Sequence, residues 1–135
     1  MRLRVENVRT LVVPALELTN EQRAAWSGLL QEDPALDSPY LRPEFTEAVA
    51  AVRSNVCVGI ATDNGKPVAF LPFEKSRFGA GKPVGGALNG CQALIARPET
   101  GCDVAHLVCR CGLHVWDFDH LVTSHQPRQP FHMAC

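Results

Sequence analysis

The clearest pattern in the chain is a pair of apolar runs joined by a polar turn. The first run covers residues 56–61 and the second covers residues 67–73, and each has the length of a single strand. Between the runs, Asn64 and Gly65 occupy a turn, and both residue types tolerate the positive φ angles that a tight hairpin requires. The pattern therefore predicts an antiparallel β-hairpin, around which the other elements are expected to be organised.

The segment before the hairpin begins with strand patterns and continues with helical spacing. Residues 2–6 alternate polar and apolar side chains, which predicts a short strand with one buried face. The apolar run 11–13 ends at Pro14, because proline cannot donate a hydrogen bond to a neighbouring strand. Thr19, followed three residues later by Gln22, has the spacing of a capping box and predicts the start of a helix.

Two helices are predicted between Thr19 and the hairpin. The first helix ends at Pro34, and the second begins at Arg42 or Pro43. Proline is tolerated in the first turn of a helix because the N–H group that it lacks would have no hydrogen-bond partner there. Apolar residues at spacings of three and four indicate that one side of each helix is buried. These stripes consist of Trp26, Leu29 and Leu30 in the first helix and Phe45, Ala48, Val49 and Val52 in the second.

The part of the chain after the hairpin contains a glycine-rich segment and then three further elements. Residues 76–87 include four glycines and a proline, so we expect a loop with little intrinsic order. Residues 92–96 predict a third strong strand, and residues 102–111 predict a helix that is closed by Gly112. Residues 113–121 alternate again, which predicts a final strand with a buried aromatic face and an acidic face turned to water or to a partner.

The order of these elements indicates an α+β fold. We expect a mixed, mainly antiparallel sheet covered by helices, in which the last helix returns its strand parallel to the sheet. A length of 135 residues is typical of one domain, which we place at residues 1–123. The tail 124–135 is rich in proline, glutamine and histidine and is expected to be poorly ordered.

Composition argues against several classes of protein. The formal net charge of -1 provides no general attraction to nucleic acid or to an anionic membrane. No apolar run approaches the roughly 18 residues of a membrane span, and residues 1–10 lack the apolar segment of a signal peptide. We therefore expect a cytoplasmic chain whose six cysteines are reduced thiols rather than a disulfide framework.

The sequence Gly-Ala-Gly-Lys at residues 79–82 superficially resembles a phosphate-binding loop. A P-loop needs glycine where this chain has Ser76, and a serine or threonine where it has Pro83. An acetyltransferase pyrophosphate loop needs a helix directly after the glycines, and Pro83 with Gly85 and Gly86 prevents one. We therefore interpret this segment as a surface loop and assign no cofactor-binding residue.

Five residues within 102–114 have side chains that commonly bind zinc: Cys102, His106, Cys109, Cys111 and His114. On a helix, Cys102, His106 and Cys109 share a face that Cys111 does not join, and the turn-held Cys-x2-Cys pair of typical zinc sites is absent. We assign no metal ligand and keep a small zinc-binding protein as an alternative.

The acidic face of the last predicted strand offers candidate substrate-binding residues, and the alternative is that this face is a solvated edge or a domain interface. Asp117 and Asp119 lie on the same side of that strand, and two neighbouring carboxyls raise the pKa of one of them. His120 points to the other face, so an Asp–His dyad within the strand has poor geometry. No residue lies in a nucleophile elbow such as Gly-x-Ser-x-Gly, so the catalytic residues stay unassigned.

Four segments, taken in order, resemble the CelD-like acetyltransferases of cellulose biosynthesis. They are LDSPYLRPEF at 36–45, NGKPVAFLPF at 64–73, GAGKPVGGALN at 79–89 and WDFDHL at 116–121. This family belongs to the GNAT superfamily and is related to the Fem-type aminoacyltransferases. The resemblance covers most of the chain, from Leu36 to Leu121.

The resemblance implies one half of a two-lobed enzyme more than twice this length. Each lobe of such an enzyme is GNAT-like, and the C-terminal lobe holds most of the site for acetyl-CoA or another acyl-CoA. The chain resembles the N-terminal lobe alone, and its tail 124–135 does not resemble the family's continuation. We therefore expect a truncated lobe that binds no cofactor by itself and whose partner is the missing C-terminal acyltransferase lobe.

The function implied by the resemblance is transfer of an acyl group from coenzyme A to a sugar-linked or amine acceptor of a polysaccharide or cell envelope. The isolated chain is expected to be inactive, and no catalytic residue is carried over from the family. Because no nucleophile, metal cluster or sound phosphate loop is apparent, a non-catalytic protein-interaction module is the second hypothesis.

Overall fold

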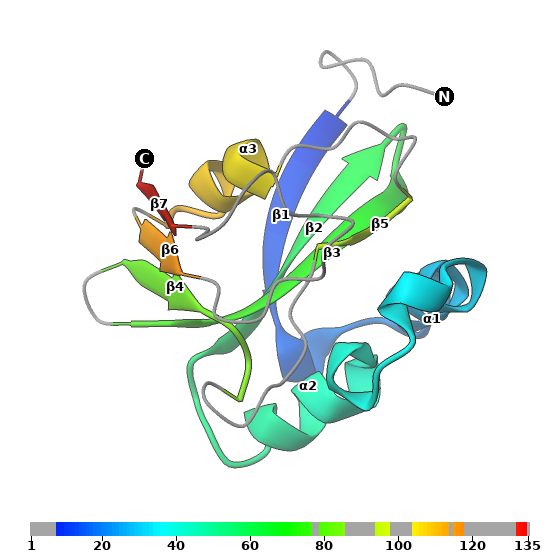
Figure 1. Cartoon of the computed structure of the whole chain (residues 1–135), viewed down its shortest axis with the longest axis horizontal. Coiled ribbons are helices and arrows are strands. Elements are labelled where there is room, and N and C mark those ends of the chain that lie inside the picture. The colour runs from blue at the N-terminus through cyan, green and yellow to red at the C-terminus, as the bar shows by residue number, and fades with distance from the viewer. Residues whose placement is uncertain are drawn as a thin grey trace.

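One mixed sheet with helices on both of its faces forms the fold (Figure 1). The computed structural model describes residues 8–76, 79–85, 94–97, 104–113, 115–117 and 132–134, so the strand predicted at 2–6 lies outside the described residues. The strands are β1 (Val8–Pro14), β2 (Val56–Asp63), β3 (Lys66–Lys75), β4 (Ala80–Lys82), β5 (Ile95–Ala96), β6 (Val115–Asp117) and β7 (His132–Ala134). The α-helices are α1 (Asn20–Glu32), α2 (Pro43–Ala50) and α3 (Val104–Arg110), and short 3-10 helices cover Ala15–Glu17, Pro34–Leu36 and Pro39–Leu41.

The predicted hairpin is confirmed as the centre of the sheet. Strands β2 and β3 pair antiparallel from Val56 opposite Glu74 to Asp63 opposite Lys66. The turn between them has φ angles of 52° at Asn64 and 81° at Gly65, both in the left-handed region. A two-residue turn with two positive φ angles matches the right-handed twist of the strands it joins, which explains why asparagine and glycine occupy it.

The strands form a sheet in the order β1-β2-β3-β4-β6-β7, and β5 also pairs with β3. Strand β1 pairs antiparallel with β2, while β4 and β6 are parallel to each other. The predicted α+β class, with a mixed and mainly antiparallel sheet, is therefore confirmed. The parallel return after the last helix is also confirmed, because α3 lies between β4 and β6 in the chain.

Two strands occur where the sequence indicated little order. Ala80–Lys82, within the predicted loop, forms β4 and pairs with both β3 and β6. His132–Ala134, within the tail, forms β7 and pairs with β6, and the rest of the tail lies outside the described residues. Strand formation depends on partners supplied by distant segments, so local composition does not reveal these pairings.

The starts of α1 and α2 follow the predicted capping signals, whereas the prediction that Val52 belongs to the buried stripe of the second helix is wrong, because α2 ends at Ala50 and Val52 is exposed. At the start of α1, Gln22 N–H donates to Thr19 Oγ1 at 3.1 Å and Thr19 N–H donates to Gln22 Oε1 at 2.9 Å. Pro43 is the first residue of α2, and Gly112 has a φ of 77° just beyond α3, as its position after the helix predicted. Within the described ranges, no helix is both long enough and apolar enough to cross a membrane.

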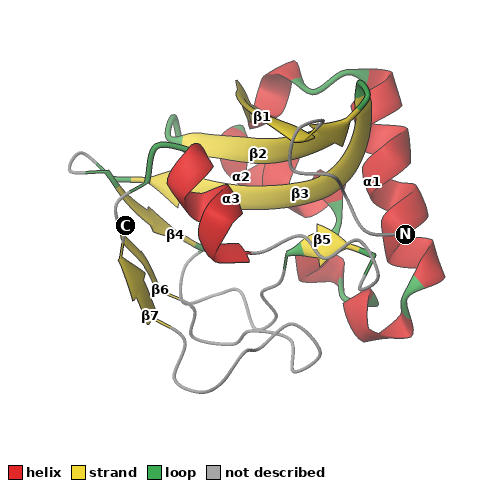
Figure 2. Cartoon of the chain, turned by 90° about the horizontal axis from the view of Figure 1, so that it is seen from above, coloured by secondary structure: helices red, strands yellow, loops and turns green. Residues whose placement is uncertain are grey.

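The sheet separates two apolar clusters. Helices α1 and α2 cover one face of the sheet (Figure 2). Val56, Val58 and Ile60 of β2 belong to the cluster that also contains residues of these helices. Helix α3 covers the opposite face (Figure 2). Leu71 and Phe73 of β3 belong to the cluster that also contains Leu107 and Val108 of α3. Alternation along each strand therefore supplies apolar side chains to both layers, and both sides of the central hairpin are buried.

Candidate functional site

The acidic pair predicted at Asp117 and Asp119 is only partly covered by the structure. Asp117 is the last residue of β6 and lies opposite His132 of β7 in the sheet register. Asp119 lies outside the described residues. The two aspartates therefore stay a prediction, and the described residues contain a different polar site.

The glycine-rich segment is held in place by a buried carboxylate. The fully buried Glu74 of β3 accepts a hydrogen bond from the backbone N–H of Gly85 at 2.8 Å and another from Arg53 Nη1 at 3.0 Å. A phosphate at this segment would meet the negative charge of Glu74 and would find the Gly85 N–H already engaged. This contact supports the interpretation that residues 79–82 are not a P-loop.

The predicted cysteine states need one correction. Cys57 and Cys111 are free thiols, whereas Cys109 is disulfide-bonded, so the expectation of six reduced thiols is wrong for Cys109. The expectation rested on the cell compartment, but a disulfide also depends on which sulfurs the fold brings together. Among the described residues, no group of three or more His, Cys, Asp or Glu residues could hold a metal ion.

The two free thiols lie between the sheet and α3. The sulfur of Cys111 sits so close to Gly59 of β2 that a Cβ at position 59 would overlap it. Cys57 is two residues from Gly59, and its side chain packs against the cluster that contains Cys111. Burial and the neighbouring Cys57 raise the pKa of the Cys111 thiol to about 12, although Lys75 acts in the opposite direction. Because the thiolate is the reactive form, this environment makes Cys111 a packing residue rather than a nucleophile.

The raised pKa of Cys111 predicts a loss of stability at alkaline pH. An ordinary thiol has a pKa of 9.0, so between about pH 9 and pH 12 the unfolded chain releases a proton that the folded chain keeps. The free energy of unfolding should fall by up to about 1.4 kcal/mol per pH unit in this window. Urea unfolding under argon at several pH values tests this, and the Cys111→Ala chain should show a shallower slope. Equal slopes would show that Cys111 titrates in the folded chain as it does in the unfolded one.

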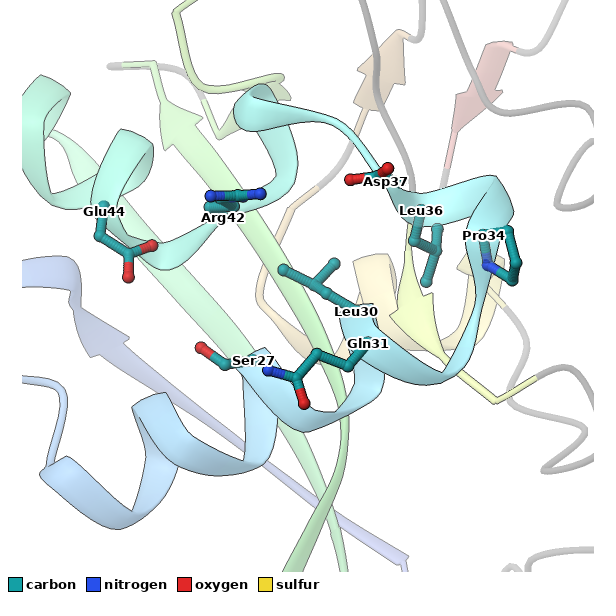
Figure 3. A pocket seen from close by; sticks show the side chains of 8 residues that line it. All are labelled: Ser27, Leu30, Gln31, Pro34, Leu36, Asp37, Arg42 and Glu44. Carbon is teal, nitrogen blue, oxygen red and sulfur yellow. The ribbon is translucent and has the colours of Figure 1, made fainter.

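The candidate functional site is a half-open cleft of about 480 Å³ between α1 and the segment that leads into α2 (Figure 3). One wall comes from α1 and the other from the connector 34–44. Figure 3 shows Arg42 between Asp37 and Glu44 in this view, with Leu30 pointing from α1 into the space. The lining residues are Ser27, Leu30, Gln31, Pro34, Leu36, Asp37, Arg42 and Glu44.

Buried contacts position the connector wall. Leu36 and Leu41 are almost completely buried in the cluster beneath α1 and α2. The indole N–H of Trp26 on α1 donates to the Leu41 carbonyl at 2.8 Å, within the interior. The Trp26 ring also stacks on Phe70 of β3, with 5.4 Å between centroids. The connector is therefore anchored to both α1 and the central hairpin, so its polar residues are held at fixed places on the surface.

Two capping hydrogen bonds and one ion pair also hold the elements around the cleft in place. The side chains of Asp33 and Ser38 accept hydrogen bonds from the N–H groups of Ala35 and Tyr40, which starts each short 3-10 helix of the connector. Arg23 of α1 bonds Glu47 of α2 at 2.7 Å, with both side chains partly exposed. This pair joins the two helices beside the cleft, although a partly exposed pair contributes only modestly to stability.

The polar groups of the cleft are available to a ligand. Within the described part of the chain, the side chains of Ser27, Gln31, Asp37, Arg42 and Glu44 make no hydrogen bond or ion pair with one another or with their neighbours. Together they present a hydroxyl, an amide, two carboxylates and a guanidinium above the apolar groups of Leu30 and Leu36. A few convergent polar groups over apolar side chains are typical of small-molecule sites.

The cleft was not predicted from the sequence, although one of its walls lies in a segment that had been singled out for another reason. The segment 36–45 was singled out because it resembles the CelD-like family, and Leu36, Asp37, Arg42 and Glu44 belong to it. Ser27 and Gln31 on α1 carry no motif and read as ordinary solvent-facing positions of a helix. Their role depends on the position of the connector, which no pattern within α1 indicates.

A smaller cavity of about 230 Å³ lies between α1 and β3. Its rim is closed by Arg97, which makes two hydrogen bonds to the Glu32 carboxylate at 2.6 and 2.8 Å. Arg97 holds the pKa of Glu32 below its usual range. Because these charges already satisfy each other, this cavity offers a ligand fewer free polar groups than the cleft does.

Comparisons with known proteins do not assign the chain to a family. No protein-family model matches it, and no curated protein or solved structure matches it either. The relation to the CelD-like acetyltransferases therefore stays a prediction that rests on the four sequence segments.

Proposed function

We propose that this chain is the N-terminal lobe of a GNAT-type acyltransferase and that its cleft contributes to binding the acceptor. One observation carries the proposal: the segment 36–45, which resembles the CelD-like family, forms a wall of the 480 Å³ cleft. The reaction would move an acyl group from coenzyme A to a sugar-linked or amine acceptor of a polysaccharide or cell envelope. A cytoplasmic location fits this use of acyl-CoA.

The charges of the cleft support acceptor binding rather than cofactor binding. Acyl-CoA carries phosphates, which proteins hold with backbone N–H groups at helix N-termini and with basic side chains. The cleft instead places the carboxylates of Asp37 and Glu44 beside the single guanidinium of Arg42. In this proposal the acyl-CoA site and the catalytic groups belong to the missing C-terminal lobe, which is the partner of this chain.

Calorimetric titration of the purified chain with acetyl-CoA tests the lobe assignment. We expect no saturable heat, because the described residues offer no phosphate site at residues 79–82 and the cleft has the wrong charge. Saturable binding of acetyl-CoA at micromolar concentration would contradict the assignment, since the chain would then hold the cofactor site itself.

A non-catalytic interaction module is the second candidate, favoured by the exposed apolar residues of the outer strand. Strand β1 is the end strand of the described sheet, and Leu11 and Val12 on it are 38% and 42% exposed, with Leu16 just beyond at 59%. An edge strand with exposed apolar side chains is a ready surface for another chain. This candidate predicts a protein partner that the wild-type chain retains in a pull-down and that a Leu11→Lys, Leu16→Lys chain loses, with no affinity for acetyl-CoA in either.

A further inference from the structure

The balance of charge in the cleft narrows the class of ligand. Asp37 and Glu44 contribute two negative charges and Arg42 contributes one positive charge, so the lining has an excess negative charge. All three side chains are exposed and have no partner among the described residues, so their charges act on whatever enters. A phosphate or carboxylate ligand would be repelled by two of the three groups, whereas an ammonium would be attracted by two.

The hydrogen-bonding groups that line the cleft restrict the class of ligand further. Carboxylates only accept hydrogen bonds, a guanidinium only donates, and a hydroxyl and an amide do both. Ser27 and Gln31 present the last two kinds of group from the α1 wall, opposite the charged connector wall. A ligand that forms hydrogen bonds with the polar groups of both walls needs several donors and acceptors close together. A ring that carries hydroxyl groups has this arrangement.

The apolar side chains of the cleft, which we call its apolar floor, also restrict the class of ligand. Leu30 points into the space between the polar groups and Pro34 lines the same cleft, while Leu36 is buried beneath them. A pyranose ring presents C–H groups on its faces and hydroxyls at its edge, so it can cover an apolar floor while bonding to a polar rim. A linear alkylamine would bond to a carboxylate but would make no hydrogen bond to Ser27, Gln31 or Arg42, so it gains fewer contacts in the cleft than a ring with hydroxyls.

We propose that the cleft binds an amino sugar, with the ammonium group at one of the two carboxylates, Asp37 or Glu44, and the ring hydroxyls at the other carboxylate and at Ser27, Gln31 and Arg42. This inference rests on the proposed function, since it names the class of acceptor for the same site. No chemical step is assigned to these residues, which bind and orient the ligand.

Titration of the full ¹⁵N-labelled chain with D-glucosamine tests the proposal by NMR. We expect saturable shifts of amide resonances at the cleft residues, weaker binding of glucose and of butylamine, and no binding of glucose 6-phosphate. The Asp37→Asn and Glu44→Gln chains should each bind glucosamine about tenfold more weakly, because each loses a charged acceptor for a hydrogen bond from the ammonium or from a hydroxyl. Glu21→Gln makes the same chemical change at an exposed position on α1 outside the cleft, so it should leave the affinity unchanged.

Three outcomes would overturn the proposal: no glucosamine binding, equal binding of glucose or butylamine, or an affinity that the two cleft substitutions do not lower. The acetyl-CoA titration on the same sample reports on the lobe assignment separately. Failure with glucosamine and no binding of acetyl-CoA would reject the amino sugar and leave the lobe assignment standing. Saturable binding of acetyl-CoA would reject the lobe assignment whatever the sugars do.

Discussion

Replacing Trp26 with alanine is expected to lower the free energy of unfolding by about 3–5 kcal/mol, the usual cost of deleting a buried aromatic side chain. Trp26 is fully buried, its ring stacks on Phe70, and its N–H donates to the Leu41 carbonyl. Since a domain is stable by only about 5–15 kcal/mol, this substitution removes a large share of the total. Equilibrium unfolding in urea, followed by circular dichroism, measures the loss.

A Trp26→Phe chain separates the hydrogen bond from the packing. It keeps an aromatic ring against Phe70 but removes the N–H, so the buried Leu41 carbonyl loses its donor at a cost of about 1–3 kcal/mol. Val52→Ala serves as the control, because Val52 is 82% exposed and its truncation should change stability little. Trp26 variants as stable as this control would show that the connector does not depend on the tryptophan.

The Gly59→Ala chain is expected to be less stable than wild type by about 1–3 kcal/mol, the usual cost of adding an atom to a filled core. Gly59 lies in the middle of β2, paired with Val12 on one side and Leu71 on the other. A methyl group at this position overlaps the sulfur of the buried Cys111, so either α3 or the thiol has to move. The midpoint of urea unfolding reports the change.

The Cys111→Ala background should reverse the sign of this effect. Once the sulfur is absent, the nearest atoms to a Cβ at Gly59 are those of Leu71 at 3.7 and 3.8 Å, which are ordinary contacts. Replacing the glycine then mainly restricts the unfolded chain, which stabilises by about 0.4–1 kcal/mol. A double-mutant cycle measures the coupling between the two positions. If Gly59→Ala has the same cost in both backgrounds, the overlap with Cys111 is not its cause.

Elements whose causes lie within a few residues could be predicted from the sequence. Asn64 and Gly65 accept the positive φ angles of the hairpin turn, and Thr19 and Gln22 satisfy each other's backbone groups at the start of α1. These features arise from steric limits and short-range hydrogen bonds, which act before any distant segment is in place. The α+β class could also be predicted from the sequence, because the spacing of apolar residues indicates which elements form and which of their faces are buried.

The sequence alone therefore determined the hairpin, the starts of α1 and α2 and the class of fold, since each depends on neighbouring residues. Only the tertiary structure paired Ala80–Lys82 and His132–Ala134 as strands, set Cys111 against Gly59, and brought α1 against the connector to form the cleft. Those arrangements depend on packing across the domain, such as β4 against β6 and Gly59 against Cys111, and their free energy comes from burial and pairing that exist only after the whole domain has folded.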